Sequence, residues 1–120
     1  MGESTRDRGR SGEQRAAEYL QRRGWEILER NFSLFGAEVD IIAECQGEYH
    51  FVEVKSWRTI DRRDIEYAID RRKQARIARV AGGYLASLPA SEMPVVHFDV
   101  IFVDPDGMEV YAIDDAFYME

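Results

Sequence analysis

The sequence predicts a single α/β domain, a mixed β-sheet flanked by helices with the element order αβββαββ. The chain has 120 residues, which is the length of one domain with its own core. Hydrophobic residues make up 45% and charged residues 32%, a composition that excludes disordered, collagen-like and coiled-coil chains. Segments with the apolar spacing of helices and short β-branched runs follow one another along the chain, as in a layered fold of helices and strands.

The first helix is expected to begin at Ser11, so that residues 1–9 form a flexible polar arm and residues 10–120 form the single domain. Ser11 and Gln14 stand at the spacing of a capping box, which favours a helix start. Gly24 is expected to end the helix. The apolar stripe of this helix is formed by Ala16, Ala17 and Leu20.

Three strands are expected next, over residues 25–32, 37–44 and 48–54. The second and third form a hairpin through the turn Cys45-Gln46-Gly47-Glu48. With a turn of four residues, Glu44 faces Tyr49 and Asp40 faces Glu53.

One long helix and two strands are expected in the second half of the chain. The helix runs from Asp64 to about Ser87, before Pro89. The strands span residues 95–103 and 108–113, on either side of the turn Asp104-Pro105-Asp106-Gly107.

Two charged residues fall in the apolar faces of the expected helices. Glu13 lies in the middle of the first stripe, either as a first-turn acid favoured by the helix dipole or as an acid directed at a functional site. Lys73 is four residues from both Ile69 and Ile77. Its ammonium either snorkels to an edge or reaches a buried acid, and its place near the middle of the helix favours the second interpretation.

The expected hairpin places two acids opposite each other among apolar residues. Directly paired side chains have Cβ atoms about 5 Å apart, so the carboxylates of Asp40 and Glu53 repel. A divalent cation between them removes the conflict, and carboxylate oxygens suit Mg²⁺, with Mn²⁺ as a substitute. Lys55 follows Glu53 on the same face and can hold a water beside the cation. The alternative is an ordinary solvent-facing hairpin.

The net charge of −7 argues against a nucleic-acid partner, but the distribution of charge favours one. Residues 1–79 hold all 16 Lys and Arg with 15 acids, whereas residues 80–120 hold 8 acids and no Lys or Arg. The first part can therefore present a basic face, which includes a stripe beside Lys73 formed by Arg72, Arg76 and Arg79. A solvated charged surface is the alternative that charge alone allows.

The remaining candidate residues are weaker. A single cysteine, Cys45, excludes a disulfide framework and a cysteine-based zinc site. His50 and His97 stand alone in strand patterns and Asp99 lies in a central strand, so all three are expected to be structural. Since no targeting segment and no apolar run of membrane-spanning length is visible, we expect a cytoplasmic protein without a membrane partner.

An ordered series of motifs resembles the PD-(D/E)xK superfamily of nucleases. Within it, the series is similar to the YraN-like family of bacterial endonuclease-like proteins, which is related in pattern to archaeal Holliday-junction resolvases. The motifs are Gly12-Glu13, Ala17-Glu18-Tyr19-Leu20, Arg30-Asn31-Phe32, Gly36-Ala37-Glu38-Val39-Asp40-Ile41-Ile42-Ala43, Phe51-Val52-Glu53-Val54-Lys55 and Phe98-Asp99-Val100-Ile101. The resemblance covers nearly the whole chain.

The resemblance implies a restriction-endonuclease-like fold with a Mg²⁺ site. It implies that Asp40, Glu53 and the Val54 carbonyl are ligands, that Lys55 activates water, and that Glu13 joins the site as a further ligand of metal or water.

Two positions depart from the family pattern. Ala37 stands where a second glycine is usual. Trp57 interrupts the run in which Arg58 is expected to contact phosphate.

Together these features predict a Mg²⁺-dependent endonuclease that hydrolyses phosphodiester bonds in DNA, with branched DNA favoured by analogy to resolvases. Lys73 and Glu38 are expected to support the site, and the arginine stripe to contact the DNA backbone. Two cuts in a branched DNA need two sites, which favours a homodimer. The alternatives are a non-catalytic nucleic-acid-binding module of the same fold, and a protein-interaction domain that uses the acidic residues 80–120.

Overall fold

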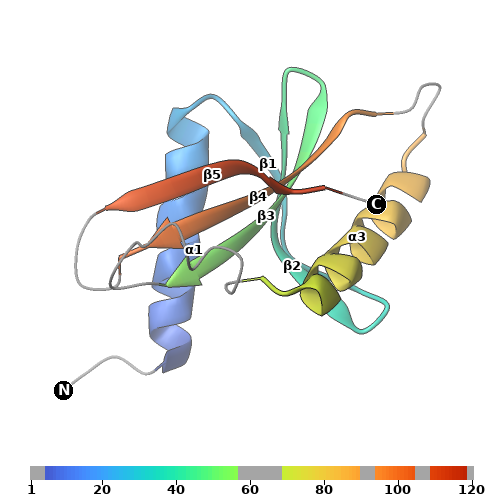
Figure 1. The fold of residues 1–120 in the computed structure, drawn as a ribbon. Helices are drawn as coiled ribbons and strands as arrows, with labels where there is room; N and C mark the ends of the chain where they lie inside the picture. Colours follow the sequence, from blue (N-terminus) through green and yellow to red (C-terminus); the bar gives the residue numbers. More distant parts are fainter. Residues whose placement is uncertain (1–4, 57–68, 90–93, 105–108, 119–120) are drawn as a thin grey trace.

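The computed structural model describes residues 5–56, 69–89, 94–104 and 109–118 (Figure 1). Its helices and strands follow the predicted order αβββαββ. They are α1 (Thr5–Arg22), β1 (Glu26–Leu34), β2 (Ala37–Cys45), β3 (Glu48–Ser56), α3 (Arg71–Ala86), β4 (Val96–Val103) and β5 (Val110–Phe117). None of the described helices is long and apolar enough to span a membrane.

The strands form one five-stranded sheet in the order β1-β2-β3-β4-β5. The pairs β1–β2, β2–β3 and β4–β5 are antiparallel, and β3 and β4 are parallel. The sheet is therefore mixed, as predicted. The parallel pair lies at its centre, and α3 belongs to the crossover connection that a parallel pair requires.

The helices cover opposite faces of the sheet, as Figure 1 shows. Neighbouring residues of the central strands alternate between the two cores, because successive side chains of a strand point to opposite faces. The core beneath α3 includes Ile42, Phe51, Val100 and Phe102. The core beneath α1 includes Ile41, Val52, Ile101 and Val103. The predicted stripe of α1, formed by Ala16, Ala17 and Leu20, is fully buried there.

Local backbone chemistry sets several element ends as predicted. Gly24, with φ of 87°, ends α1. Its N–H bonds the Gln21 carbonyl, and the N–H of Trp25 bonds the Leu20 carbonyl, which is the Schellman arrangement. The β2–β3 turn has positive φ at Gln46 and Gly47, as a tight hairpin requires.

Several element boundaries differ from the prediction, most of them by one or two residues. Helix α1 begins at Thr5, not Ser11, because the arginine-rich residues before Ser11 continue the helix and the capping-box signal lies inside it. Residues 5–9 of the expected arm are therefore helical. Strand β5 continues to Phe117 instead of ending at Ile113.

The second helix starts later than the prediction. Helix α3 begins at Arg71, since the Asp70 carboxylate accepts a hydrogen bond from the Lys73 N–H at 2.8 Å and caps it. Ile69, which lies inside the predicted helix, is buried but precedes the first residue of α3. Residues 64–68 and the turn at residues 105–107 lie outside the described residues.

Strands β1 and β2 bend together where Asn31 and Asp40 lie. Asn31 has a left-handed φ of 53°. Val39 packs in the core beneath α3, whereas Ile41 packs in the core beneath α1, although residues two apart share a face in a regular strand. The bend carries the outer half of this hairpin toward α3, where the side chain of Leu34 leaves no room for a Cβ atom at Gly83.

Candidate functional site

The bend in β2 separates this strand from β3 and places Asp40 at the point of separation. The pairing runs in the predicted register from Cys45 opposite Glu48 to Ile41 opposite Val52. The ladder ends there, so the predicted pairing of Asp40 with Glu53 is not formed. Instead, the N–H of Val54 donates to the Asp40 carboxylate at 2.8 Å. A side chain thus takes the place of a backbone acceptor, which fixes Asp40 beside the middle of β3.

Glu53 is the most deeply buried charged group near this point. Its side chain is 3% exposed, and its Oε2 atom contacts the ammonium of Lys73 at 3.1 Å. Its Oε1 atom is buried without a hydrogen-bond partner. The prediction that Lys73 reaches a buried acid is thereby confirmed. An unpaired buried carboxylate oxygen is costly, which points to a ligand that the protein chain does not supply.

Both carboxylates are costly to ionise, chiefly because they are buried. Burial and the nearby charge of Asp40 raise the pKa of Glu53 from 4.5 to about 7, against the opposing effect of Lys73. Burial likewise raises the pKa of Asp40, although the Val54 N–H and the two lysines oppose it. In both residues burial is the main cause of the shift, so each carboxylate is costly to ionise where the fold places it.

Two lysines face these acids and lie close enough to interact with each other. Burial and the neighbouring charge of Lys73 lower the pKa of Lys55. Burial acts in the same direction on Lys73, but contact with Lys55 and the charge of Glu53 raise its pKa above 10.5. The pKa values of the two lysines therefore shift in opposite directions, and Lys73 is the lysine in contact with Glu53.

Glu13 lies on the α1 side of the same site. Burial and the charge of Asp40 raise its pKa, while a hydrogen bond from the Asn31 side chain lowers it. Asn31 was part of a motif but had no assigned role. Its left-handed backbone was not predictable from strand periodicity, although asparagine is one of the few residues that tolerates this conformation.

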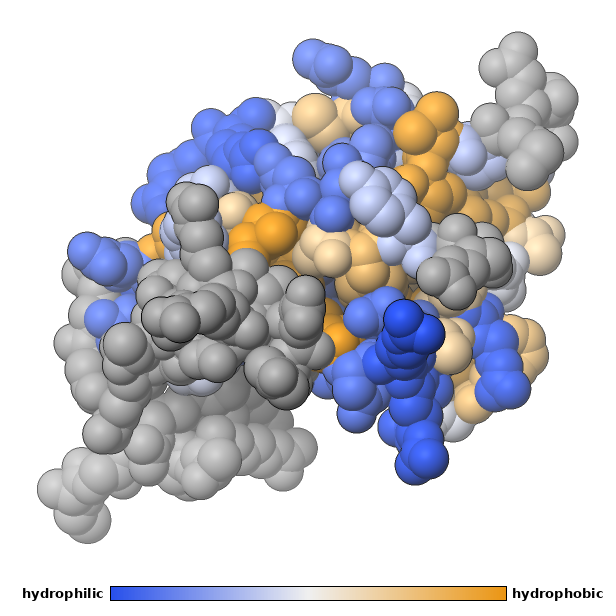
Figure 2. Space-filling view, in the orientation of Figure 1, coloured by the Kyte–Doolittle hydropathy of each residue, from blue (hydrophilic) through white to orange (hydrophobic). Residues whose placement is uncertain are grey.

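The other predicted site residues lie around this centre. Glu38 is exposed at the rim and contacts the Ser33 hydroxyl at 3.4 Å, and its charge acts on Glu13. The side chains of the α3 stripe are exposed, and Figure 2 shows hydrophilic residues gathered near the start of α3. The stripe consists of Arg72, Arg76 and Arg79. Arg58 lies outside the described residues.

The donor atoms of the site fit a hard divalent cation. Asp40, Glu53 and the Val54 carbonyl offer oxygen ligands, and the unpaired Glu53 oxygen gives one of them a free coordination position. Across the described part of the chain, no three acidic, histidine or cysteine side chains are grouped closely enough to hold a metal. Glu13 does not complete such a set, so a cation at Asp40 and Glu53 would need water or an anionic ligand as well.

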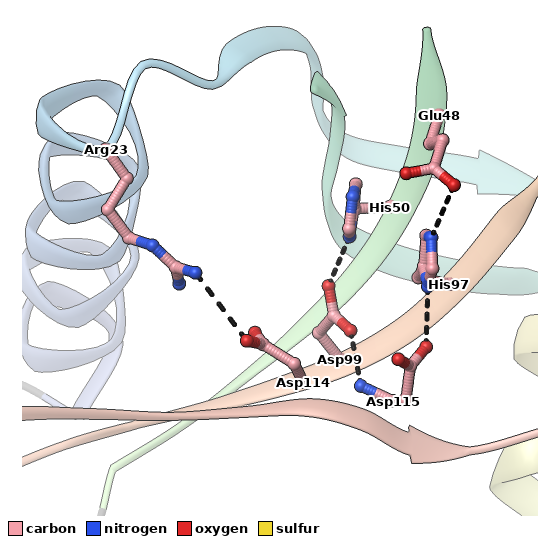
Figure 3. A network of polar contacts seen from close by, with 7 residues as sticks. All are labelled: Arg23, Glu48, His50, His97, Asp99, Asp114 and Asp115. Atoms are coloured by element: carbon pink, nitrogen blue, oxygen red, sulfur yellow. Dashed lines mark hydrogen bonds and ion pairs between the residues drawn. The ribbon is translucent and has the colours of Figure 1, made fainter. Parts of the chain in front are cut away.

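A second polar network, away from these residues, joins β3, β4 and β5 (Figure 3). His50 contacts the buried Asp99 carboxylate at 2.7 Å, and the other Asp99 oxygen accepts the Asp115 N–H at 2.8 Å. His97 contacts Asp115 at 2.6 Å and forms an ion pair with Glu48 at 3.5 Å. The structural interpretation of Asp99 agrees with this arrangement.

The expectation that the two histidines are isolated is wrong. They are opposite each other in the parallel β3–β4 register, and their rings stack with centroids 4.5 Å apart. Trp25 packs on His50 at 3.9 Å, and the Arg23 guanidinium lies over the Trp25 ring and pairs with Asp114 at 3.6 Å. The parallel register is a tertiary feature, so no local pattern of residues predicts this contact.

Comparison with known proteins places most of the chain in one group of sequences. The model of the family described as "Uncharacterised protein family UPF0102" matches residues 12–103. UPF0102 protein STH1475 of Symbiobacterium thermophilum is 42% identical over 113 residues, covering 92% of this chain and 95% of the relative. A UPF0102 protein of Halorhodospira halophila is 36% identical, covering 96% and 90%.

Two solved structures are similar at low sequence identity. A fdxN element excision controlling factor protein from Anabaena variabilis aligns with a TM-score of 0.47 and 16% identity, covering 87% of this chain and 97% of that protein. SfsA from Pyrococcus furiosus, in complex with Ca²⁺, aligns with a TM-score of 0.33 and 16% identity, covering 93% and 64%. Both similarities are distant.

Proposed function

The chain belongs to the uncharacterised protein family UPF0102, and we propose that this member is a metal-dependent endonuclease that hydrolyses phosphodiester bonds in DNA. The observation that carries the proposal is the pair of buried acids, Asp40 and Glu53, with one Glu53 oxygen unpaired and two lysines beside them. The αβββαββ order and the acid, acid-x-lysine series agree with the restriction-endonuclease-like pattern.

In the proposed hydrolysis, some residues of the site bind the cation and others stabilise charge. Asp40, Glu53 and the Val54 carbonyl would hold Mg²⁺ or Mn²⁺, and the bound cation would polarise the phosphodiester and activate water. Lys55, two residues beyond Glu53 and close to Lys73, orients the attacking water and offsets the charge that develops on the phosphate. Glu13, held by Asn31, accepts a hydrogen bond from water at the α1 side.

Helix α3 connects the site to a surface for a polyanion. Lys73 points to Glu53 from the first turn of α3, and the arginine stripe is exposed along the same helix. Arginines of this kind bind backbone phosphates, which position a nucleic acid without reading its sequence. Branched DNA is the substrate class that we favour by analogy, with a homodimer to supply two cuts.

A cleavage assay tests this function. Linear, flapped and four-way DNA are incubated with the protein in Mg²⁺, Mn²⁺ or chelator, beside Asp40→Asn protein purified in the same way. The proposal requires cleavage that depends on the metal and on Asp40. DNA binding without cleavage in Mn²⁺ would favour the non-catalytic module, and absence of DNA binding at low salt would favour the protein-interaction domain.

A further inference from the structure

We propose that Lys73 is an internal competitor for the cation site: its ammonium holds Glu53 in the metal-free protein and leaves this carboxylate when a divalent cation binds. The inference rests on the proposed metal site and adds a control on how that site is loaded. The contact that motivates it is the ion pair between Lys73 Nζ and Glu53 Oε2 at 3.1 Å.

In the metal-free protein, the Lys73 ammonium supplies positive charge to Glu53 where a bound cation would supply it. Asp40 and Glu53 carry two negative charges when ionised, and Lys55 and Lys73 carry two positive charges when protonated. The four groups interact closely enough to shift one another's pKa values. Adding a divalent cation to this balanced set creates an excess of positive charge in a largely buried region, where repulsion between like charges is strong. A cation therefore enters more easily if one ammonium moves away.

Position decides which lysine moves. The side chain of Lys73 is 37% exposed, and it extends from the first turn of α3, so its ammonium can return to water by a change of rotamer. Lys55 lies on β3 within the paired region, opposite Phe102 of β4. Glu53 itself is 3% exposed and cannot follow Lys73 into solvent. Lys73 is thus the movable partner, and Glu53 is the fixed one.

The test measures Mn²⁺ binding directly, from the electron paramagnetic resonance signal of free Mn²⁺. Wild type, Lys73→Met and the control Arg71→Met are titrated at pH 8, above the raised pKa of Glu53, which is about 7. We expect Lys73→Met to bind Mn²⁺ at least about tenfold more tightly than wild type, because it lacks the competing charge. Arg71→Met, a change at an exposed position on the same helix, should stay within about twofold of wild type. Equal or weaker binding by Lys73→Met would overturn the inference.

A second measurement needs no substitution and covers the case in which Lys73→Met does not fold. The chain has only two lysines, Lys55 and Lys73, so acetic anhydride modification of each is resolved by mass spectrometry. Saturating Mn²⁺ should increase the modification rate of Lys73 severalfold in wild type, and an unchanged rate contradicts its release. Suppose that wild-type protein cleaves DNA and binds Mn²⁺, but Lys73→Met binds Mn²⁺ no more tightly and Mn²⁺ leaves the modification rate of Lys73 unchanged. In that case only this inference is wrong. If neither wild type nor Lys73→Met binds Mn²⁺, the proposed metal site is wrong as well.

Discussion

At the residue scale, the proposed chemistry depends on Glu53, a carboxylate that the fold buries with only one oxygen paired. The pattern of acids and lysines was sufficient to predict that Asp40, Glu53, Lys55 and Lys73 lie close together, because each breaks an apolar pattern in a regular element. Asn31 could not be predicted in the same way. Its role follows from a left-handed backbone conformation inside a strand, which no spacing rule indicates.

The raised pKa of Glu53 predicts a pH dependence of stability in the absence of metal. The folded protein holds the Glu53 proton up to about pH 7, whereas an unfolded chain releases it near 4.5. The free energy of unfolding should therefore fall as the pH rises from 4.5 to about 7. Glu53→Gln removes this dependence, so its stability relative to wild type should improve between pH 4 and pH 8, by about 3 kcal/mol at most. Urea unfolding in chelator measures it.

The control for this prediction is Glu26→Gln, which removes an exposed carboxylate from β1. Its stability relative to wild type should change little over the same pH range. If the difference in unfolding free energy between Glu53→Gln and wild type is also independent of pH, Glu53 ionises normally in the folded protein.

Substitution of Lys55 should separate catalysis from metal binding. Lys55→Ala is expected to abolish metal-dependent cleavage while Mn²⁺ binding and folding are retained, because the proposed role is in the transition state. Lys55→Arg, which keeps the charge, should retain part of the activity. A loss of less than about tenfold in the cleavage rate of Lys55→Ala, a little over 1 kcal/mol, removes Lys55 from the mechanism.

At the element scale, two of the irregularities in the described sheet lie beside the polar clusters, and sequence patterns did not predict either of them. The bend of β1 and β2 opens space beside β3 for the site. The second is a register shift between Phe98 and Val100 in the β4–β5 pair. There Asp115 has a left-handed φ of 51°, and its N–H bonds the Asp99 side chain instead of the neighbouring strand. The order of elements along the chain and the register of the β2–β3 hairpin up to Ile41 followed from periodicity and turn residues. These local departures depend on tertiary contacts.

The histidine network predicts a second pH dependence of stability. This one comes from a basic group, His97, whose pKa is raised by neighbouring carboxylates. Burial disfavours a charged His97, but the carboxylates of Asp115 and Glu48 raise its pKa above 6.5. The charged ring therefore stabilises the fold fully below pH 6.5, and this contribution is lost as the pH rises through the higher folded value. His97→Gln should cost about 1 kcal/mol more at pH 5.5 than at pH 9, measured by urea unfolding.

The control for the histidine network is Asp114→Asn, which removes an exposed carboxylate next to Asp115 on β5. Its cost should be nearly the same at both pH values, since it contacts neither histidine in the described network. If His97→Gln costs the same at pH 5.5 and pH 9, the His97 charge does not hold β5.

At the scale of the whole molecule, charge is separated along the chain and the site lies where elements from both faces of the sheet meet. Helix α1 contributes Glu13 from one face and α3 contributes Lys73 from the other, with the acids of β2 and β3 between them. Sequence patterning predicted the fold order and the acidic second part. The resemblance and the charged residues in the two apolar faces also led us to expect Glu13 and Lys73 at one site. The point at which β2 separates from β3 could not be predicted, because it depends on tertiary contacts.

The exposed arginines of α3 predict how DNA binding responds to salt. Replacing Arg72, Arg76 and Arg79 together with Gln should weaken binding to any DNA sequence. It should also reduce the salt dependence of log affinity by roughly 0.9 per lost phosphate contact. Fluorescence anisotropy over a range of salt concentrations measures the slope, with Arg22→Gln on α1 as the control for net charge. An unchanged slope in the triple variant would place the DNA on another surface.

The central claim, that Asp40 and Glu53 form one metal site, is tested most directly by thermal melts of wild type and Asp40→Asn in chelator and in saturating Mn²⁺. Asn can still accept the Val54 N–H and removes one of two repelling charges. In chelator, the variant should be as stable as wild type or more stable, with a gain of up to about 1 kcal/mol in the free energy of unfolding. Saturating Mn²⁺ should reverse the order, because a ligand stabilises only a protein with a competent site. A variant that is less stable in chelator by more than about 1 kcal/mol, the size of one lost hydrogen bond, would contradict the paired-carboxylate site.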